Sequence, residues 1–245
     1  MFSDLQNFNE LYKKFEVVDL SPLLERGIPR WPTHPHLVID QTVYHKKDGY
    51  YCQTLNMGEH VGCHVDAPYH VNEHLPEKTV EKVKPDTLIG RAVVYDFSDM
   101  DLQPGDQLPA EAFLEHEKKT GVKVGKGDIA LINFGWMQKH WKLDKEGYYY
   151  ATNSPGMDES AVKLLYDRGI KAVGCDNIAC DQAVVDGVSK FASGHQKYWL
   201  PNDILIMEMM NNLDKLPAEC FVIAIPLKIE NGSGSPIRPI ALVER

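Results

Sequence analysis

Residues 60–70 of the chain read HVGCHVDAPYH, and together with His74 they place four of the ten histidines within fifteen residues. An even spread of histidines along the chain would place about 0.6 in such a window. Imidazoles gathered around a carboxylate are typical of metal-binding sites and of acid–base catalysis. This stretch is therefore the first place to expect a functional site.

The stretch alternates between two kinds of residue, as a half-buried β-strand does. Small or apolar residues stand at the odd-numbered positions 61–67, and His60, Gly62, His64 and Asp66 stand at the even ones. A helix would turn Asp66 away from the two histidines, and glycine and proline inside the stretch disfavour a helix. We therefore predict a strand with His60, His64 and Asp66 on one face.

These three side chains are candidate metal ligands. On an ideal strand the Cα atoms of His60 and His64 lie about 13 Å apart, near the limit for two imidazoles to reach one ion. We therefore expect a bend or bulge at Gly62, where the absent side chain leaves room for a metal. Two imidazoles and a carboxylate suit Zn²⁺, Mn²⁺ or Fe²⁺, and three protein ligands leave coordination positions open for catalysis. The alternative is a set of satisfied polar residues at a strand end, or a solvated face that contains histidines.

The stretch resembles the HxGTHxDxPxH signature of the cyclase-like metal-dependent hydrolases, a family that includes bacterial kynurenine formamidase and isatin hydrolase. Six of the seven fixed positions match, and Cys63 replaces the usual threonine. We interpret Cys63 as a small residue on the core face. A thiolate ligand or nucleophile is the alternative, although the strand alternation points Cys63 away from the histidines.

The resemblance extends over most of the chain and implies a mixed α/β architecture, the swivelling β/β/α fold with a central mixed β-sheet or barrel flanked by helices. Residues 27–35 (GIPRWPTHP) are similar to the family's Trp-Pro-Gly segment beside the pocket. Trp31 is therefore implied to bind substrate with its aromatic face, and a core tryptophan is the alternative.

Residues 156–159 and 169–182 resemble the family's helix, strand and loop before a distal histidine, implied to be His195. In members with a second metal, this histidine and a later glutamate, here Glu208, complete the site. Glu208 also stands out alone, because a carboxylate in the apolar run 204–210 is costly to bury without a partner. It could instead reach solvent or a structural arginine, and His195 alone would more often be structural. The resemblance thus implies one or two divalent ions per chain, Zn²⁺ or Mn²⁺.

A mechanism follows from an open metal site beside an acid or base. The metal would activate water to attack a carbonyl carbon and would stabilise the developing oxyanion. His70 matches the family's catalytic histidine, and we expect it to transfer a proton from the water to the leaving amine or alkoxide. The alternative is that His70 is a ligand or orients Asp66. We expect His74 to lie behind the ligands or on the surface.

Three hypotheses for function are compatible with these residues. The first is a metal-dependent hydrolase of a small amide, cyclic amide or lactone, for which the resemblance suggests N-formylkynurenine, isatin or dienelactone. The second is a non-haem Fe(II) oxygenase, since two histidines and one carboxylate also form a facial triad. The third is a metal-binding or ligand-binding protein without turnover.

Composition narrows the class of protein further. The length suits one domain over residues 1–245. With a net charge of −9 and no dense lysine and arginine cluster, we expect a small-molecule substrate and no nucleic-acid partner. The chain has no long apolar run and no basic-then-apolar N-terminus, so we expect neither a membrane span nor a signal peptide. Five cysteines without CxxC spacing suit a reducing cytoplasm.

The remaining predictions concern local elements. Strands are predicted at 16–20, 37–44, 51–57, 59–66, 91–97, 128–134, 170–175, 203–210, 219–229 and 238–243, and helices at 109–120 and 157–168. A first helix, capped by Ser3, should dock within the subunit or on a partner through Leu5, Phe8, Leu11, Tyr12 and Phe15. Residues 141–150 read as a surface insertion that covers a pocket or meets another subunit, and 231–236 (NGSGSP) as a flexible loop. The resemblance implies a homo-oligomer, a dimer or tetramer.

Overall fold

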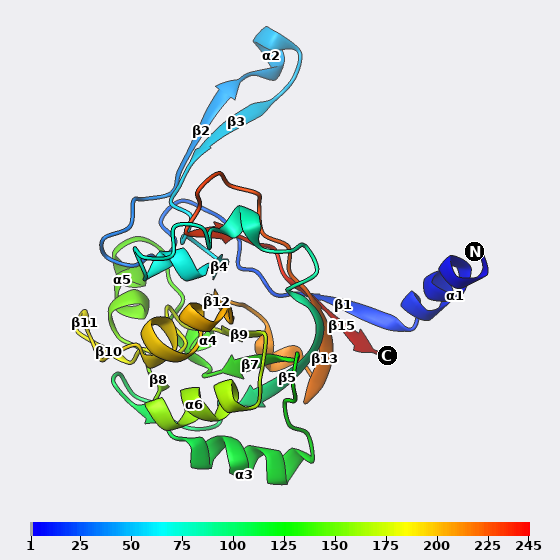
Figure 1. Ribbon diagram of the computed structural model, residues 1–245. Coiled ribbons are helices and arrows are strands. Elements are labelled where there is room, and N and C mark those ends of the chain that lie inside the picture. Colours follow the sequence, from blue (N-terminus) through cyan, green and yellow to red (C-terminus); the bar gives the residue numbers. More distant parts are fainter. Residues whose placement is uncertain (1) are drawn as a thin grey trace.

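The computed structural model describes residues 2–245 and is built around one mixed β-sheet of nine strands, which curls into a half-barrel (Figure 1). Hydrogen-bonded neighbours follow the order β1 (Phe15–Asp19), β15 (Ile240–Glu244), β13 (Glu219–Ile223), β5 (Ile89–Asp96), β7 (Ile129–Asn133), β9 (Ala172–Cys175), β12 (Leu205–Glu208), β4 (His64–Asp66) and β14 (Gly234–Pro236). Early, middle and late parts of the chain therefore meet in one sheet.

The central strands β5, β7, β9 and β12 run parallel to one another, because long crossover connections join them. Helix α3 (Ala110–Thr120) lies on the connection from β5 to β7, and α6 (Glu159–Asp167) precedes β9. Strands β7 and β9 are buried along their whole length, as strands covered on both faces are. One apolar core lies between the sheet and these helices, and a second lies on the opposite face of the sheet.

The two predicted long helices are confirmed, and their ends have clear local causes. Helix α3 follows Pro109 and ends at Gly121, whose φ of 74° favours glycine. Helix α6 begins after Asp158, whose side chain accepts the N–H of Ala161. These are the helices that cover the lower side of the sheet in Figure 1.

Strand β4 is shorter than the strand predicted over 59–66. It begins at His64, because Gly62 adopts a left-handed φ of 72° and bends the chain just before it. The bend expected at Gly62 is therefore present, but a Cβ there would lie 2.5 Å from the side chain of Leu24. The room beside Gly62 is filled by Leu24 and not by a metal, and His60 lies on the turn instead of on the strand face.

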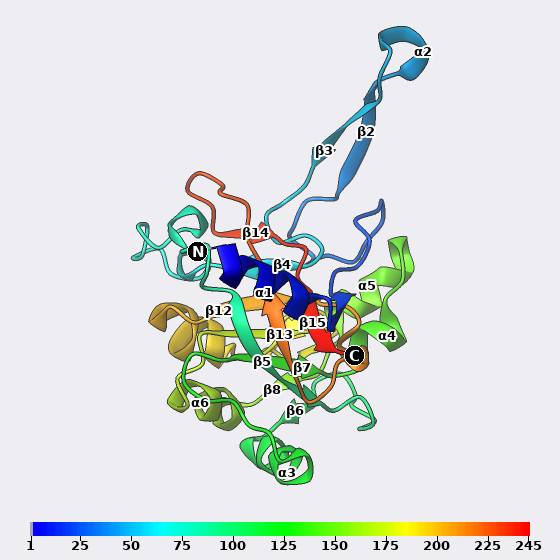
Figure 2. The ribbon, with the colours of Figure 1, turned by 90° about the vertical axis from the view of Figure 1, so that its right-hand side faces the viewer.

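Two elements project from the body of the molecule (Figures 1 and 2). The hairpin of β2 (Val38–Val43) and β3 (Cys52–Asn56), with α2 (His45–Asp48) at its tip, extends away from the sheet and is mostly exposed. Helix α1 (Phe2–Tyr12) already includes Ser3, so Ser3 is not its cap. The apolar residues of α1 are not docked within this subunit, since Leu5 is 70% and Phe8 63% exposed. Phe15 belongs to β1 and not to the helix.

Two segments differ from their predicted role. Residues 231–236 are not a flexible loop, because Gly234–Pro236 form β14 and pair with β4. Residues 141–150 are not simply a surface insertion, because most of them belong to α5 (Asp144–Thr152), whose Tyr150 is fully buried. In both cases tertiary contacts give regular structure to a sequence that lacks a local pattern.

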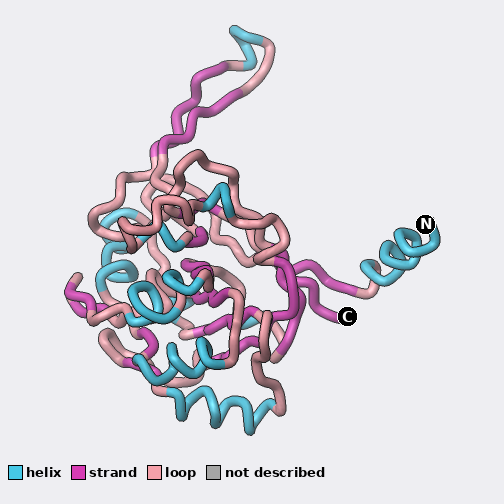
Figure 3. Tube along the Cα trace, in the orientation of Figure 1, coloured by secondary structure: helices cyan, strands magenta, loops and turns pink. Residues whose placement is uncertain are grey.

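The remaining strand predictions each overlap an observed strand, and β13 ends early because its continuation reaches Pro226, which has no N–H. Besides α5 and β14, several elements were not predicted. They are α2, β6 (Gln107–Leu108), α4 (Trp136–His140), β8 (Gly156–Met157), β10 (Val184–Val185), β11 (Val188–Ser189), the 3₁₀ turns η1 (Pro68–His70), η2 (Val80–Lys82), η4 (Leu200–Asn202) and η5 (Leu213–Lys215), and the π-helical turn η3 (Gly194–Tyr198). Figure 3 shows that loops and such short turns make up most of the end of the body beneath the hairpin. No helix within residues 2–245 is long and apolar enough to cross a membrane.

Candidate metal centre

Strands β4 and β12 bring together residues that lie far apart in the sequence. The strands pair antiparallel, with Glu208 opposite His64 and Ile206 opposite Asp66. The turn before β4 adds His60, η1 adds His70, and η3 adds His195. Five of the six predicted ligand and catalytic residues are buried, with exposed fractions of 8% or less: His60, His64, Asp66, His195 and Glu208.

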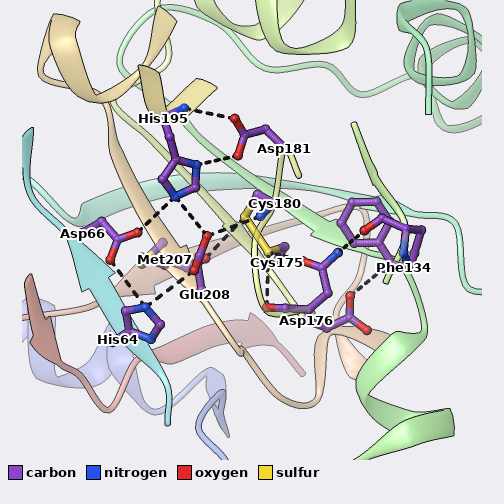
Figure 4. The surroundings of a disulfide bond; sticks show 12 residues. His64, Asp66, Phe134, Cys175, Asp176, Cys180, Asp181, His195, Met207 and Glu208 are labelled. Carbon is purple, nitrogen blue, oxygen red and sulfur yellow. Dashed lines mark hydrogen bonds and ion pairs between the residues drawn. A yellow bond between two sulfur atoms is a disulfide. The ribbon is translucent and has the colours of Figure 1, made fainter. Parts of the chain in front are cut away.

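The carboxylate of Asp66 lies at the centre of this group, and Figure 4 shows it between His64 and His195. Its Oδ1 lies 2.6 Å from Nδ1 of His60 and 3.4 Å from Nε2 of His64. Its Oδ2 lies 3.4 Å from Nε2 of His195 and is buried without a hydrogen-bond partner among residues 2–245. A buried carboxylate oxygen without a donor is costly unless a cation satisfies it.

Glu208 is the second buried carboxylate of the group. Its Oε2 lies 3.6 Å from Nε2 of His64, and its Oε1 lies 3.5 Å from Nε2 of His195. The backbone N–H of Cys180 donates to Oε1 at 3.4 Å. The predicted alternative, a glutamate that reaches solvent or an arginine, does not match this position.

The electrostatics of these groups reflect crowding of like charges away from water. Burial, and then the charge of Asp66, raise the pKa of Glu208 well above its usual value. Burial opposes ionisation of Asp66 too, but the imidazoles of His70 and His60 bring its pKa well below the usual range. Burial lowers the pKa of His64 to about 4 and that of His70 to about 3. His64 and His70 are therefore held neutral, the form in which imidazole binds metals.

The side chains fit a divalent ion. Two sets of three have ligand atoms within 4.8 Å of one another: His60, Asp66 and His70, and His64, Asp66 and Glu208. Asp66 belongs to both, and the predicted trio of His60, His64 and Asp66 is divided between them. Three imidazoles and two carboxylates, one of them with the unsatisfied Oδ2 of Asp66, form a donor set suited to Zn²⁺ or Mn²⁺.

His195 is oriented by a residue that sequence analysis missed. Asp181 accepts the N–H groups of Gly194 and His195 at 2.6 and 3.0 Å, and its Oδ1 lies 2.5 Å from Nδ1 of His195. Burial lowers the pKa of His195, but the charge and hydrogen bond of Asp181 outweigh it and raise that pKa well above the usual value. The aspartates within residues 169–182 were the available sequence signal for this partner.

A cavity of about 290 Å³ opens onto the candidate ligands. Trp31 and His34 line it on the side of residues 27–35, so Trp31 lies where the resemblance implied. The rest of the lining combines apolar side chains with two amides: Val71, Ile178, Ala179, Ala192, Gln182 and Gln196. His74 is exposed and does not line this cavity.

Cysteine positions both confirm and correct the sequence analysis. Cys63 is 3% exposed and packs in an apolar core, and burial raises the pKa of its thiol, which confirms a small core residue. The expectation that the cysteine pattern suits a reducing cytoplasm loses its support, because Cys175 and Cys180 form a disulfide beside Glu208 (Figure 4). The turn after β9 brings their Cα atoms to 5.6 Å, within the range a disulfide needs. The cysteine pattern therefore no longer supports a reducing compartment.

Known proteins are similar to this chain in sequence and in structure. Residues 18–182 match the family model described as "Putative cyclase". An isatin hydrolase of Roseibium aggregatum is 30% identical over 197 residues, 77% of this chain and 73% of that protein, and a kynurenine formamidase of Bacillus cereus is 23% identical, over 93% and 98%. An isatin hydrolase A from Ralstonia solanacearum superimposes with a TM-score of 0.85 at 24% identity, over 100% of this chain and 98% of that one. An isatin hydrolase bound to the product analogue thioisatinate gives 0.79 at 26%, over 99% and 98%. These matches confirm the predicted fold.

Proposed function

The chain belongs to the cyclase family, and from this premise we propose that it is a metal-dependent hydrolase of a small amide or cyclic amide. The observation that carries the proposal is the carboxylate of Asp66, buried between two sets of ligand atoms beside a cavity of about 290 Å³. Relatives named isatin hydrolase and kynurenine formamidase support this reaction class.

The proposed centre takes one or two divalent ions. The resemblance implies one ion on His60, His64 and Asp66 and a second on Asp66, His195 and Glu208. These groups differ from the two sets of neighbouring ligand atoms in the structure, but they share Asp66 with them. When bound, such an ion lowers the pKa of water toward neutrality and polarises a carbonyl group. Asp66 faces both sets, so its replacement should affect both.

His70 is the proposed proton carrier. Its ring centroid lies 4.0 Å from that of His60 and 6.3 Å from that of His195, and the residue lines the cavity. Burial keeps its imidazole neutral, so it can accept a proton and pass it to the departing nitrogen. The competing role, a metal ligand beside His60 and Asp66, is separated from this one by the metal content of a His70 variant.

The cavity lining favours a small substrate with a flat ring. Trp31 offers an aromatic wall, Ile178 adds apolar surface, and the amides of Gln182 and Gln196 can bind a carbonyl or N–H group. Cyclic amides such as isatin and formanilides such as N-formylkynurenine have this chemistry, and lactones share the reacting carbonyl.

The test is a hydrolysis screen of isatin, formanilides and unsaturated lactones with Zn²⁺- or Mn²⁺-loaded protein under nitrogen, combined with elemental analysis. We expect turnover of at least one amide without oxygen, with one or two ions per chain. A strict requirement for Fe²⁺ and O₂ would instead identify an oxygenase. Bound metal with no turnover across the panel would identify a binding protein.

We further propose that the chain forms a homo-oligomer. The exposed apolar residues of α1, Leu5 and Phe8, support an assembly because a partner surface would remove them from water. Light scattering of the purified protein tests the assembly, and a mass of about 28 kDa would contradict it.

A further inference from the structure

Residues 231–236 pack against His60 and are held in place by backbone hydrogen bonds. Strand β14 pairs with β4, and the carbonyl of Ser233 accepts the N–H of Ala67 at 2.9 Å. A Cβ atom at Gly234 would lie 2.4 Å from Cε1 of His60, so only glycine allows the chain to pass this close to the ring. The position of Ser233 beside His60 is therefore set by backbone pairing.

The hydrogen bonds that join Glu59, Ser233 and His60 have a defined direction. Ser233 donates its hydroxyl to Oε2 of Glu59 at 2.7 Å, and its backbone N–H donates to the same oxygen at 2.9 Å. Nε2 of His60 lies 2.8 Å from the same hydroxyl oxygen. A serine hydroxyl has one hydrogen, and a carboxylate can only accept it. Ser233 must therefore accept from His60, which places the imidazole hydrogen on Nε2.

This direction decides what the other ring nitrogen can do. A neutral imidazole with its hydrogen on Nε2 has a lone pair on Nδ1. Nδ1 of His60 faces Oδ1 of Asp66 at 2.6 Å, so two electron-pair donors point toward one another. Such a pair is stable only with a cation between the two atoms, either a second ring hydrogen on Nδ1 or a divalent ion bound by that lone pair.

We propose that Glu59 and Ser233 are positioning residues that hold His60 in the Nε2–H tautomer, so that Nδ1 is its metal-binding atom. The proposal rests on the metal centre of the proposed function. It assigns a role in metal binding to a segment that the sequence presents as a loop, and to a glutamate directly before the first histidine of the motif.

The first test measures the Zn²⁺ dissociation constant of the full chain by competition with a chromogenic chelator. Ser233→Ala removes the acceptor for Nε2–H, and we expect Zn²⁺ to bind about 10- to 100-fold more weakly. Ser233→Thr keeps the hydroxyl and should restore most of the affinity. Ser235→Ala is the matched control, because Ser235 is a buried serine two residues further on, in β14, that bonds only backbone groups, at Leu227 and Pro236. It should lower the melting temperature and leave Zn²⁺ affinity unchanged.

The second test reverses the direction of the hydrogen bonds that run from His60 through Ser233 to Glu59. The amide of a Glu59→Gln variant can donate to Ser233, whose hydroxyl hydrogen is then free to turn toward Nε2 of His60. That arrangement moves the imidazole hydrogen to Nδ1, so Glu59→Gln should weaken Zn²⁺ binding more than Ser233→Ala does. The ¹⁵N shifts of His60 in Zn²⁺-loaded parent protein should show hydrogen on Nε2 and metal on Nδ1.

Several outcomes would overturn this inference. Unchanged Zn²⁺ affinity in Ser233→Ala and Glu59→Gln would do so, as would a hydrogen on Nδ1 of His60 in the Zn²⁺-loaded parent. An equal loss of affinity in Ser235→Ala would show that Ser233 acts only through stability. A parent that binds Zn²⁺ with this tautomer and hydrolyses nothing would overturn the proposed hydrolase alone, and a parent that binds no Zn²⁺ would overturn both.

Discussion

Glu208 lies directly opposite His64 in the antiparallel pairing of β12 with β4, and its Oε2 stands 3.6 Å from Nε2 of His64. This pairing joins the histidine-rich stretch to a strand from the last fifth of the chain. Asp66, two residues further along β4, then faces His195 as well as His60. The candidate centre therefore depends on strand register and not on the motif alone.

Asp66→Asn should abolish metal binding at both proposed positions. The amide keeps the shape of the side chain but removes the charge that both sets of ligand atoms share. We expect less than one ion per chain by elemental analysis and a loss of turnover of about 100-fold or more. Thermal unfolding of the metal-free variant is the control for folding, and full metal content in this variant would contradict the shared-ligand assignment.

Asp181→Asn should weaken metal binding through His195. The amide is a poorer partner for Nδ1, so Nε2 of His195 is held less firmly toward Asp66 and Glu208. Metal affinity should fall about 10- to 100-fold in a chelator titration.

Asp176→Asn is the matched control for that variant. Asp176 is a buried aspartate of the same loop that accepts two backbone N–H groups, from Phe134 and Met137, and bonds to neither His195 nor Glu208. Its variant should lose stability while its metal affinity stays unchanged. If both variants lose affinity equally, the effect belongs to the loop and not to the orientation of His195.

His70→Ala should separate proton transfer from metal binding. If His70 carries the proton, turnover falls by about 100- to 10,000-fold while the metal content is unchanged. His74→Ala, four residues away and exposed, should behave as the parent does. Loss of metal in parallel with activity would make His70 a ligand.

Glu117→Gln should destabilise the fold away from the site. Glu117 pairs with Arg168 and accepts the hydroxyl of Tyr95 at 2.7 Å, with both ionic side chains largely buried. Removing the charge leaves Arg168 without its partner, so the free energy of unfolding in urea at pH 7 should fall by about 2–4 kcal/mol.

The difference in free energy of unfolding between the parent and Glu117→Gln should become smaller as the pH falls. Burial raises the pKa of Glu117, but its bonds to Arg168 and Tyr95 outweigh burial and lower it below the usual value of 4.5. A carboxyl group whose pKa is lower in the folded state than in the unfolded state stabilises the fold. This stabilisation is complete above the pKa of the unfolded state and is lost as the pH falls through the pKa of the folded state. The parent and Glu117→Gln should therefore converge in stability as the pH drops below about 4. A gap that stays constant down to pH 3 would contradict the ion pair.

Local patterns in the sequence predicted many of the strands and helices. Runs rich in apolar and β-branched residues predicted β5, β7 and β9, because these strands are wholly or partly buried. Pro109, Gly121 and Gly169 mark the ends of α3 and α6 locally. The alternation in residues 60–67 assigned Cys63 to the core. The exposed helix α1 shows the limit, since an apolar stripe indicates a contact surface but not its partner.

By itself, the sequence determined the family, the fold class and which side chains were candidates for chemistry, because motif spacing, residue type and local periodicity are properties of neighbouring residues. Only the tertiary structure decided that Gly62 makes room for Leu24, that Asp66 is the shared carboxylate, and that Ser233 bonds His60 from 173 residues away. Residues 231–236 are rich in glycine and serine, which locally indicates a loop. Gly234–Pro236 nevertheless form β14 and lie against the site, because pairing with β4 supplies hydrogen bonds that no local pattern can encode.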